Sequence, residues 1–509
     1  MRKRFWMSGF VACAVSAGLA VACGGDDDAA NNASPDPGTP DGATPTQDGN
    51  TADSTTDAAV DAPATSLVPK TSLELPNAID PYGLVYGSDG FLYASGSTLD
   101  GADQKLAVWR FKDGALDATF GTGGVVTVDV PGNELSFDIV EVSAGNFVVH
   151  AVAGGKIYLV KLTKEAGGNF VFGTPKFVKF GFDEGEGWPV GTPNPPAADP
   201  AYASWGIGVD RSVANTPKIV VFAFGAPAKP LVAANQRTLD DRWITRVLAD
   251  TLEIDPAFNG GAPWSVDADG KDKRDQGRRG IVLDDGSIIS SGYTDFGSKN
   301  NVVLIRLKPD GTADTTFGFG IEDAGASPGQ TKFNPFSASG GFAEAYGVVR
   351  QSTGRLVTTG YGTSNFDTPS IAVDLVSFGV NPDGIDPTYG KLGSFVVQSE
   401  TNPSAGQNDA GIVPWDDRGR DIAVLPDDRI VHAGLYDFAA SIFVTSKDGK
   451  LESTSGDGGT LAYPWRQSFF KVAVSPDGKA IAATAKSLRP GGDASAPLGS
   501  LLVTLAVGQ

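Results

Sequence analysis

Short apolar runs that alternate with polar residues recur along most of this chain, and tight turns separate them. One repeated element is a strand, a turn and a second strand, as in GLVYGSDGFLYASG at 83–96 and GIVLDDGSIISSG at 280–292. Its turn centres lie at Gly90, Gly145, Asn215, Gly286, Gly354, Asp428 and Gly478. Glycine and Asn supply the positive φ that a tight hairpin needs, so the pattern predicts a hairpin at each centre.

A second element follows most of these hairpins, and it ends in an Asp-x-Thr-Phe-Gly-like corner. It is seen in LDATFGTGG at 116–124 and ADTTFGFG at 313–320, with variants at 254–261, 385–393 and 451–459 and a decayed copy near Phe172-Gly173. We expect the aromatic to pack between neighbouring sheets and the aspartate to accept hydrogen bonds from its own downstream amides.

The two elements together resemble the delta-60 repeat, a family of bacterial exported proteins. The resemblance covers roughly residues 66–509 and is clear in the units that end at Gly121, Gly318 and Gly390. It is loose at 160–250, where a proline-rich insertion at about 183–200 interrupts the pattern. The resemblance implies a propeller-like β architecture and carries no established activity.

Elementary packing favours the same fold. Each unit offers about four strands, for example Val125–Val130, Asp138–Val142, Phe147–Val152 and Lys156–Leu162. An isolated sheet of this size leaves both faces unpacked, and radial stacking of several sheets buries them. The predicted fold is all-β, a seven-bladed β-propeller of about four-stranded blades. We expect Ser72–Leu75 to complete the last blade, formed by Phe469–Val507, and so close the ring. An open β-solenoid is the alternative, but units of about 50 to 75 residues are long for one coil.

The N-terminus reads as an export signal. Arg2-Lys3-Arg4 precedes an apolar segment that ends in Leu-Ala-Val-Ala and then Cys23, which resembles a lipobox. We predict a lipoprotein signal peptide at 1–23 with lipid on Cys23, a disordered acidic linker at 24–65 and the propeller at 66–509. The residue after Cys23 is Gly24 and not the aspartate that retains many lipoproteins at an inner membrane. We therefore expect a cell-envelope protein at the outer membrane. The alternative is an ordinary secretory signal cut near Ala22.

Composition narrows the partners. The formal net charge of −20 repels phosphate backbones and argues against nucleic acid. The only cysteines are Cys13 and Cys23, so the repeat region has no disulfide and no thiolate zinc site. We expect a monomer that contacts the membrane through its lipid and binds an envelope protein or glycan.

One set of aligned residues is a candidate binding site. The position just before each inner hairpin strand is aromatic or arginine in every unit, and we call these residues the column: Tyr82, Phe137, Trp205, Arg279, Tyr346, Arg420 and Phe470. If the inner strands line a central channel, the column would ring one mouth, where such side chains stack on a sugar or hold an anion. The alternative is packing between repeats, which is the commoner role of bulky aromatics.

Other candidate chemistry is sparse. His150 and His432 fall in units two and six, and we expect both to be hydrogen-bonded structural residues without a metal role. The stretch Asp267–Asp275 partly resembles a calcium loop, but no bidentate glutamate follows and basic residues intervene, which favours a solvated loop. The glycines of 121–124 lack the Lys-Ser/Thr of a phosphate-binding loop.

Two functions are compatible with these observations. The first is a non-enzymatic binding or scaffold lipoprotein that needs no cofactor, because no catalytic constellation is visible. The second is a calcium- or quinone-dependent propeller enzyme of the sugar dehydrogenase or lactonase type, which would need histidine, arginine and carboxylates to converge at the channel mouth.

Overall fold

A computed structural model describes the chain from residue 67 to residue 507 with gaps. The described ranges are 67–76, 78–100, 103–132, 134–178, 180, 202–225, 240–266, 274–296, 299–318, 329–363, 373–397, 417–436, 439–453, 459–463, 466–487 and 499–507. All of them belong to the compact unit Ala62–Gln509. The predicted signal peptide, Cys23 and the acidic linker lie outside the described residues.

The described residues form seven antiparallel sheets of four or five strands. The first two sheets contain β2 (Ala78–Tyr86), β3 (Leu92–Asp100), β4 (Asp103–Lys112), β5 (Ala115–Leu116) and β6 (Val125–Val128), then β7 (Leu135–Ser143), β8 (Asn146–Ala153), β9 (Lys156–Lys164), β10 (Phe170–Phe172) and β11 (Lys176–Phe177). The third and fourth contain β12 (Tyr202–Asp210), β13 (Lys218–Gly225), β14 (Asp241–Leu248) and β15 (Trp264–Val266), then β16 (Asp275–Val282), β17 (Ile288–Phe296), β18 (Lys299–Leu307) and β19 (Gln330–Phe333).

The remaining three sheets repeat the plan. They contain β20 (Ala343–Arg350), β21 (Leu356–Gly362), β22 (Asp374–Asn381), β23 (Gly384–Ile385) and β24 (Ser394–Val397), then β25 (Arg418–Val424), β26 (Ile430–Tyr436), β27 (Ala439–Thr445) and β28 (Thr460–Tyr463), and finally β29 (Arg466–Val474), β30 (Ala480–Ser487), β31 (Gly499–Val507) and β1 (Leu67–Pro76). Two short 3-10 turns, Asn259–Gly261 and Ser337–Ser339, lie in connections.

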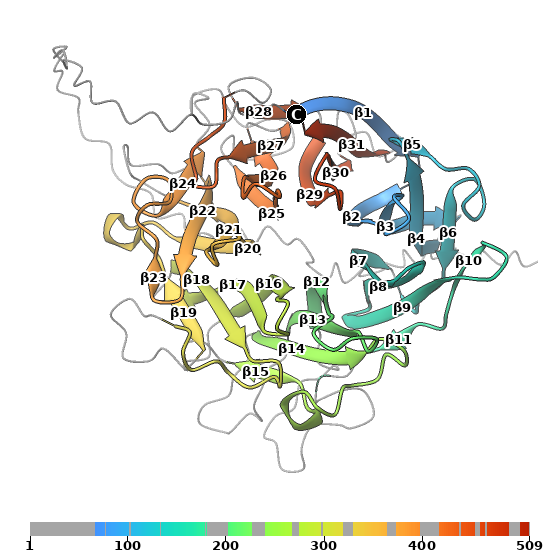
Figure 1. Cartoon of the computed structure of the whole chain (residues 1–509), viewed down its shortest axis with the longest axis horizontal. Coiled ribbons are helices and arrows are strands. Elements are labelled where there is room, and N and C mark those ends of the chain that lie inside the picture. Colours follow the sequence, from blue (N-terminus) through green and yellow to red (C-terminus); the bar gives the residue numbers. More distant parts are fainter. Residues whose placement is uncertain are drawn as a thin grey trace, which may run out of the picture. The chain divides into compact units, whose positions relative to one another are not determined.

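The sheets stand as blades around one axis (Figure 1). The first strand of each blade is innermost, and these inner strands contact one another in a closed cycle: β2, β7, β12, β16, β20, β25, β29 and back to β2. Apolar clusters fill the spaces between successive blades, as radial stacking requires. The predicted seven-bladed β-propeller is therefore confirmed.

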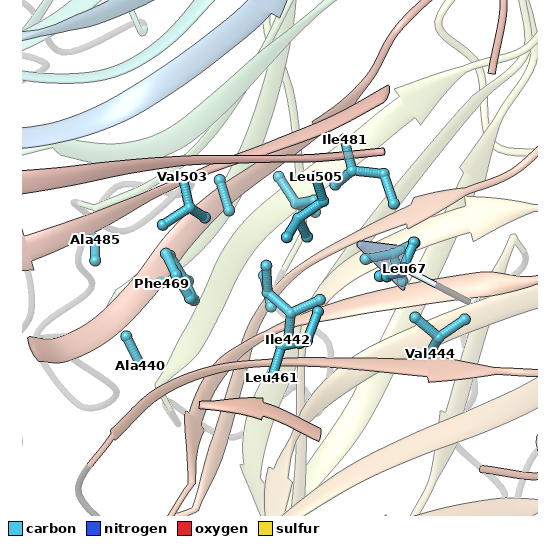
Figure 2. Packing of buried hydrophobic residues seen from close by; sticks show 14 of the residues in the cluster. Leu67, Ala440, Ile442, Val444, Leu461, Phe469, Ile481, Ala485, Val503 and Leu505 are labelled. Atoms are coloured by element: carbon cyan, nitrogen blue, oxygen red, sulfur yellow. The ribbon is translucent and has the colours of Figure 1, made fainter. Parts of the chain in front are cut away.

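The ring closes by strand exchange between the two ends of the repeat region. β1 pairs with β31 from Leu67 opposite Val507 to Pro76 opposite Gly499, and it completes the last blade as its outermost strand. Leu67 packs in a cluster with residues of the last two blades, among them Val444 and Leu505 (Figure 2). The prediction that Ser72–Leu75 closes the ring is correct, and it leaves no open edge on β31 for strand addition.

The sequence unit is out of phase with the blade. The predicted unit places Val125–Val130 in one sheet with the three strands that follow it. In the structure β6 pairs with β4 and is an outer strand of the preceding blade. The offset has a physical reason. A repeat that begins with the outer strand of one blade and continues into the next blade contributes strands to both blades. Strand pairing then links neighbouring repeats, as it links β1 to β31 at the closure of the ring.

The hairpin turns adopt the backbone that their residues predict. All seven turn centres have positive φ, between 61° at Asn215 and 92° at Gly354. They lie at one end of the blades, which we call the hairpin face. At the opposite end, which we call the variable face, the inner strands begin, and the connections there range from residue 77 alone to residues 178–201.

The Asp-x-Thr-Phe-Gly corner does what its residues suggest. The Asp314 carboxylate accepts hydrogen bonds from the Thr316 amide (3.1 Å) and hydroxyl (2.7 Å), and Arg306 lies 3.2 Å from it. The corner aromatic enters the apolar cluster shared with the next blade, as Phe258 does beside Ile305. Both expectations for this corner are confirmed.

Candidate functional site

The column residues share one backbone feature. In every inner strand the pairing register shifts at the column residue, for example between Ser136 and Asp138 around Phe137 and between Ala345 and Gly347 around Tyr346. The other shifts enclose Tyr82, Trp205, Arg279, Arg420 and Phe470. A β-bulge of this kind turns a side chain out of the regular alternation. Here it brings the column residues of different blades into contact with one another.

The column aromatics pack against one another across blades. The Tyr82 ring lies 5.2 Å from that of Phe137 and 4.5 Å from that of Phe470. The Trp205 ring lies 5.5 Å from Phe137 and 5.5 Å from Tyr346. All of these side chains are buried. The observed contacts are thus packing contacts among column members, and a binding role for the column stays a prediction.

The two column arginines join this packing in different ways. The Arg420 guanidinium lies over the Tyr346 ring at 5.1 Å and the Phe470 ring at 5.4 Å. Arg279 donates a hydrogen bond of 2.8 Å to the backbone carbonyl of Phe470, three blades away. A buried arginine keeps its charge, so Arg279 needs carboxylate neighbours.

Those neighbours come from the position that follows the column. Arg279 lies 3.4 Å from Asp421 and 3.8 Å from Asp138, and Lys471 lies 3.1 Å from Asp138 and 3.9 Å from Asp421. Asp138 also accepts a hydrogen bond of 3.2 Å from the Ile207 amide of the next blade. Two cations and two anions from four blades therefore form a charge-balanced cluster, which we call the axial ion cluster.

Gly206 leaves room for the Asp138 carboxylate in this cluster. A Cβ atom built on Gly206 would lie 3.1 Å from the Asp138 carboxylate, closer than most such contacts. The equivalent position after the column is also glycine at Gly83, Gly280 and Gly347. Small residues and charges thus share this layer, and the charges approach one another where the glycines leave room.

A third arginine, Arg278, lies on the variable-face side of the column. The fourth blade has an extra bulge residue, Arg278, whose guanidinium lies 5.2 Å from the Trp205 ring, 5.3 Å from Phe224, 5.1 Å from Tyr293 and 4.6 Å from Tyr346. Arg278 also donates hydrogen bonds to the Tyr346 hydroxyl (3.1 Å) and the Tyr293 hydroxyl (3.4 Å). This aromatic surround holds the guanidinium in one orientation.

The network continues through hydroxyls and amides. Tyr293 donates to the Gln276 side-chain oxygen (2.8 Å), and the Gln276 amide donates to Asp240 (3.1 Å). The Tyr346 and Tyr361 hydroxyls lie 3.4 Å apart. We call this set, from Asp240 through Arg278 to Tyr361 together with Glu344, the mouth network.

Glu344 is its buried acid. One carboxylate oxygen accepts a hydrogen bond from the Asn300 amide, and the other, Oε2, has no hydrogen-bond partner. Burial raises the pKa of Glu344 above its usual value, while the charge of Arg278 opposes that rise. The Nε of Arg278 is likewise buried without a hydrogen-bond partner. The mouth network thus holds one unmatched donor and one unmatched acceptor.

The outer edge of the network is partly open. Asp240, Asn300, Phe342 and Tyr361 are half-buried, whereas Arg278 and Glu344 are buried. The Phe342 and Tyr361 rings lie 6.0 Å apart and nearly perpendicular. The network therefore runs from the variable face inward to the column.

The two histidines differ from each other. The ring nitrogens of His432 lie 3.3 Å from the Thr359 hydroxyl and 3.4 Å from the Thr445 hydroxyl. Both ring nitrogens of His150 are buried without a hydrogen-bond partner, which departs from the hydrogen-bonded histidine that we expected. Burial lowers the pKa of each histidine to about 3, and the charge of Arg279 contributes at His150. Both rings are therefore neutral in the folded protein at pH 7.

The remaining candidates give little. Residues 267–273 of the calcium-like stretch lie outside the described residues. In the ranges that are described, no three His, Cys, Asp or Glu side chains gather as a metal-binding group. Within those same ranges no helix has the length and hydropathy to cross a bilayer. Gly121, Gly123 and Gly124 adopt positive φ and form turns.

The mouth network was not anticipated from the sequence, although the column next to it was. Glu344 and Arg418 lie two residues before the column members Tyr346 and Arg420. The alignment that found the column contains this position, and there the other blades carry Asp80, Leu135, Ala203, Gly277 and Ser468. Blades five and six alone carry a large charged side chain there, a departure that would have marked the site.

The fold and the packed axis place this chain among seven-bladed β-propellers. Residues 283–317, which run from the turn after β16 through β17 and β18 to the following corner, match a family described as "Domain of unknown function (DUF5122) beta-propeller". No curated protein matches the chain.

Several solved structures are similar to this chain at low identity and with low TM-scores. Hydrazine synthase of Kuenenia stuttgartiensis is 12% identical with a TM-score of 0.42, over 80% of this chain and 93% of its own. The alpha-L-arabinanase of Penicillium chrysogenum is 10% identical with a TM-score of 0.38, over 85% and 98%. The PQQ-bound aldose sugar dehydrogenase of Streptomyces coelicolor is 12% identical with a TM-score of 0.33, over 86% and 99%. Likenesses this weak carry no argument about this chain.

Proposed function

We propose that this protein is a cell-envelope lipoprotein, anchored through Cys23, whose propeller binds an envelope protein or glycan at the variable face. The observation that carries the proposal is the mouth network at that end of the axis. Its buried core of Arg278 and Glu344 is bordered by the half-buried side chains of Asn300, Phe342 and Tyr361. Convergent polar groups among aromatic side chains are typical of binding sites.

The contrast between the two ends of the propeller supports the choice of face. The turns between the first and second strands are short at the hairpin face, whereas the connections that enter each blade at the variable face range from residue 77 alone to residues 178–201. Recognition concentrates on variable connections that a rigid framework holds in place. The axial ion cluster and the packed column supply such a framework.

The direction of β1 also supports this arrangement. Leu67 pairs with Val507, whose amide donates to the Lys479 carbonyl in the last hairpin turn, so β1 begins at the hairpin face. A lipid-anchored tether that enters there would leave the variable face free for a partner.

Two experiments test the proposal. Cys23→Ser should prevent labelling with radioactive palmitate and shift the protein from the membrane fraction to the soluble fraction of envelope preparations. Unchanged labelling or unchanged membrane association would overturn the anchor.

Binding is tested with a matched pair of half-buried tyrosines, one at each face. The full chain is immobilised and exposed to separated envelope protein and glycan fractions. We expect Tyr361→Ala to weaken retention, while Tyr86→Ala at the hairpin face leaves it unchanged. Equal effects of the two variants would refute the choice of face. Stoichiometric calcium or a visible quinone absorption band in the purified protein would instead favour the enzyme alternative.

A further inference from the structure

The unmatched polar atoms of the mouth network restrict what can complete it. Arg278 Nε is a buried donor and Glu344 Oε2 a buried acceptor, and neither has a hydrogen-bond partner. An unmet buried polar atom is costly, so a ligand that matched both atoms would recover that cost on binding. Both residues are more than nine-tenths buried, with 6% and 3% of their surfaces exposed.

Charge excludes ions as the matching group. An anion placed at Arg278 would also face the Glu344 carboxylate, and a cation at Glu344 would face the Arg278 guanidinium. The two charges influence each other, since Arg278 opposes the rise in the Glu344 pKa. A neutral group that accepts from one residue and donates to the other avoids both conflicts. A hydroxyl group has this capacity.

The rim specifies more than a single hydroxyl. The Phe342 and Tyr361 rings provide half-buried apolar surface, and the Asn300 amide and the Tyr361 hydroxyl provide polar groups beside it. A ligand that meets these groups together has several hydroxyls on a carbon frame with an apolar side.

We propose that the mouth network binds a neutral saccharide, whose hydroxyl groups accept from Arg278 Nε and donate to Glu344 Oε2. This inference rests on the proposed binding function and names its ligand class. The sugar ring lies against Phe342 and Tyr361 at the variable face.

The test is a calorimetric titration of the full-length protein with D-glucose, D-galactose and N-acetyl-D-glucosamine, and with D-glucuronate and D-glucosamine as charged counterparts. We expect saturable binding of at least one neutral sugar and weaker binding of its charged counterpart. Tryptophan fluorescence gives a second readout, because the Trp205 ring lies 5.2 Å from the Arg278 guanidinium. Absence of saturation by every neutral sugar, or tighter binding of glucuronate, would overturn the proposal.

Glu344→Gln keeps the size of the side chain and removes its charge. We expect affinity for the neutral sugar to fall at least about ten-fold, because the amide offers one uncharged acceptor oxygen where the carboxylate offers two, and Asn300 already donates to one of them. The matched control is Glu452→Gln, since Glu452 is a glutamate beside a buried arginine (Arg429, 3.2 Å) that lies in the corner of the sixth blade, away from the mouth network. Unchanged affinity in Glu344→Gln would contradict the assignment.

Tyr361→Phe covers the case in which Glu344→Gln fails to fold. It removes one rim hydroxyl and should weaken sugar binding while the far-ultraviolet spectrum is unchanged; unaltered binding would count against the site. A crystal grown with the sugar provides a direct answer, and an ordered water between Arg278 and Glu344 in place of the sugar would overturn the proposal. If sugars fail but Tyr361→Ala still weakens retention of an envelope protein, the saccharide assignment falls and the binding function stands.

Discussion

The two buried histidines predict a specific response of stability to acid. The chain contains only His150 and His432, and burial lowers the pKa of each to about 3 from an ordinary value of 6.5. Between these two values the unfolded chain binds one proton at each histidine and the folded chain binds none. The free energy of unfolding is therefore unaffected by these groups above pH 6.5 and decreases as the pH falls from 6.5 towards 3.

The size of the effect follows from this linkage. One proton bound only by the unfolded state changes the free energy of unfolding by about 1.4 kcal/mol per pH unit. From pH 6 to pH 4, each histidine should therefore cost on the order of 2 to 3 kcal/mol. Two further features disfavour a protonated His150 ring. Neither ring nitrogen has a hydrogen-bond partner, and Arg279 places a positive charge nearby.

Carboxyl groups with raised pKa values oppose this trend, so the comparison must be between variants. Burial raises the pKa of Glu134 to about 7, so its contribution is present at low pH and is lost as the pH rises through 7. Substitution of a histidine leaves that contribution in place. The difference between His150→Leu and the parent protein thus isolates the histidine.

The measurement is urea unfolding of the parent, His150→Leu and His432→Leu at pH 7, 6, 5 and 4. We expect each variant to gain on the parent by about 1 kcal/mol or more per pH unit below pH 6. The comparison is independent of any constant cost that the substitution itself imposes. A difference that stays constant from pH 7 to pH 4 would refute the reasoning, because it would mean that the folded protein protonates these rings freely.

Three further predictions address packing, closure and the polar turn before the corner motif. Phe137→Ala should lower the free energy of unfolding by about 3 to 5 kcal/mol, because a fully buried ring at the axis is replaced by a cavity; a loss below about 1 kcal/mol in urea unfolding would show that the column is solvent-open. Removal of residues 67–76 should expose the edge of β31 and produce dimers or aggregates in size-exclusion chromatography, and a stable monomer of unchanged melting temperature would argue against closure by β1. Asp310 has a lowered pKa because the Thr312 hydroxyl and amide donate to it. The stability that the ionised carboxylate contributes is lost as the pH falls through its pKa in the folded protein. Asp310→Asn should therefore narrow the difference in the free energy of unfolding between pH 5 and pH 3, which parallel urea titrations would detect.

Local features were predictable because they depend on neighbours in the chain. Gly90 and Asn215 adopt positive φ as their residue types suggest, and the Asp314 carboxylate accepts a hydrogen bond from the amide two residues away. Strand patterns and repeat spacing predicted seven blades because no single sheet can bury its own faces. The same reasoning anticipated that a strand at 72–75 would complete the last blade.

Contacts between distant blades could not be deduced in this way. Arg279 pairs with Asp138 and Asp421, which lie on different blades and are far from it in sequence. The aligned column marked the residue before each inner hairpin strand as a candidate site. Its periodicity did not show that bulges would turn the side chains of different blades against one another.

What the sequence by itself determined here is the repeated blade and the number of copies, since alternation, turn residues and corners act over a few residues. Only the tertiary structure decided the site, because closing the ring brings the inner strands together at one axis. The extra bulge residue Arg278 and the buried Glu344 come from neighbouring blades and acquire their joint chemistry there. A charge that would be solvated on an isolated strand becomes a candidate recognition group when the ring excludes water from it.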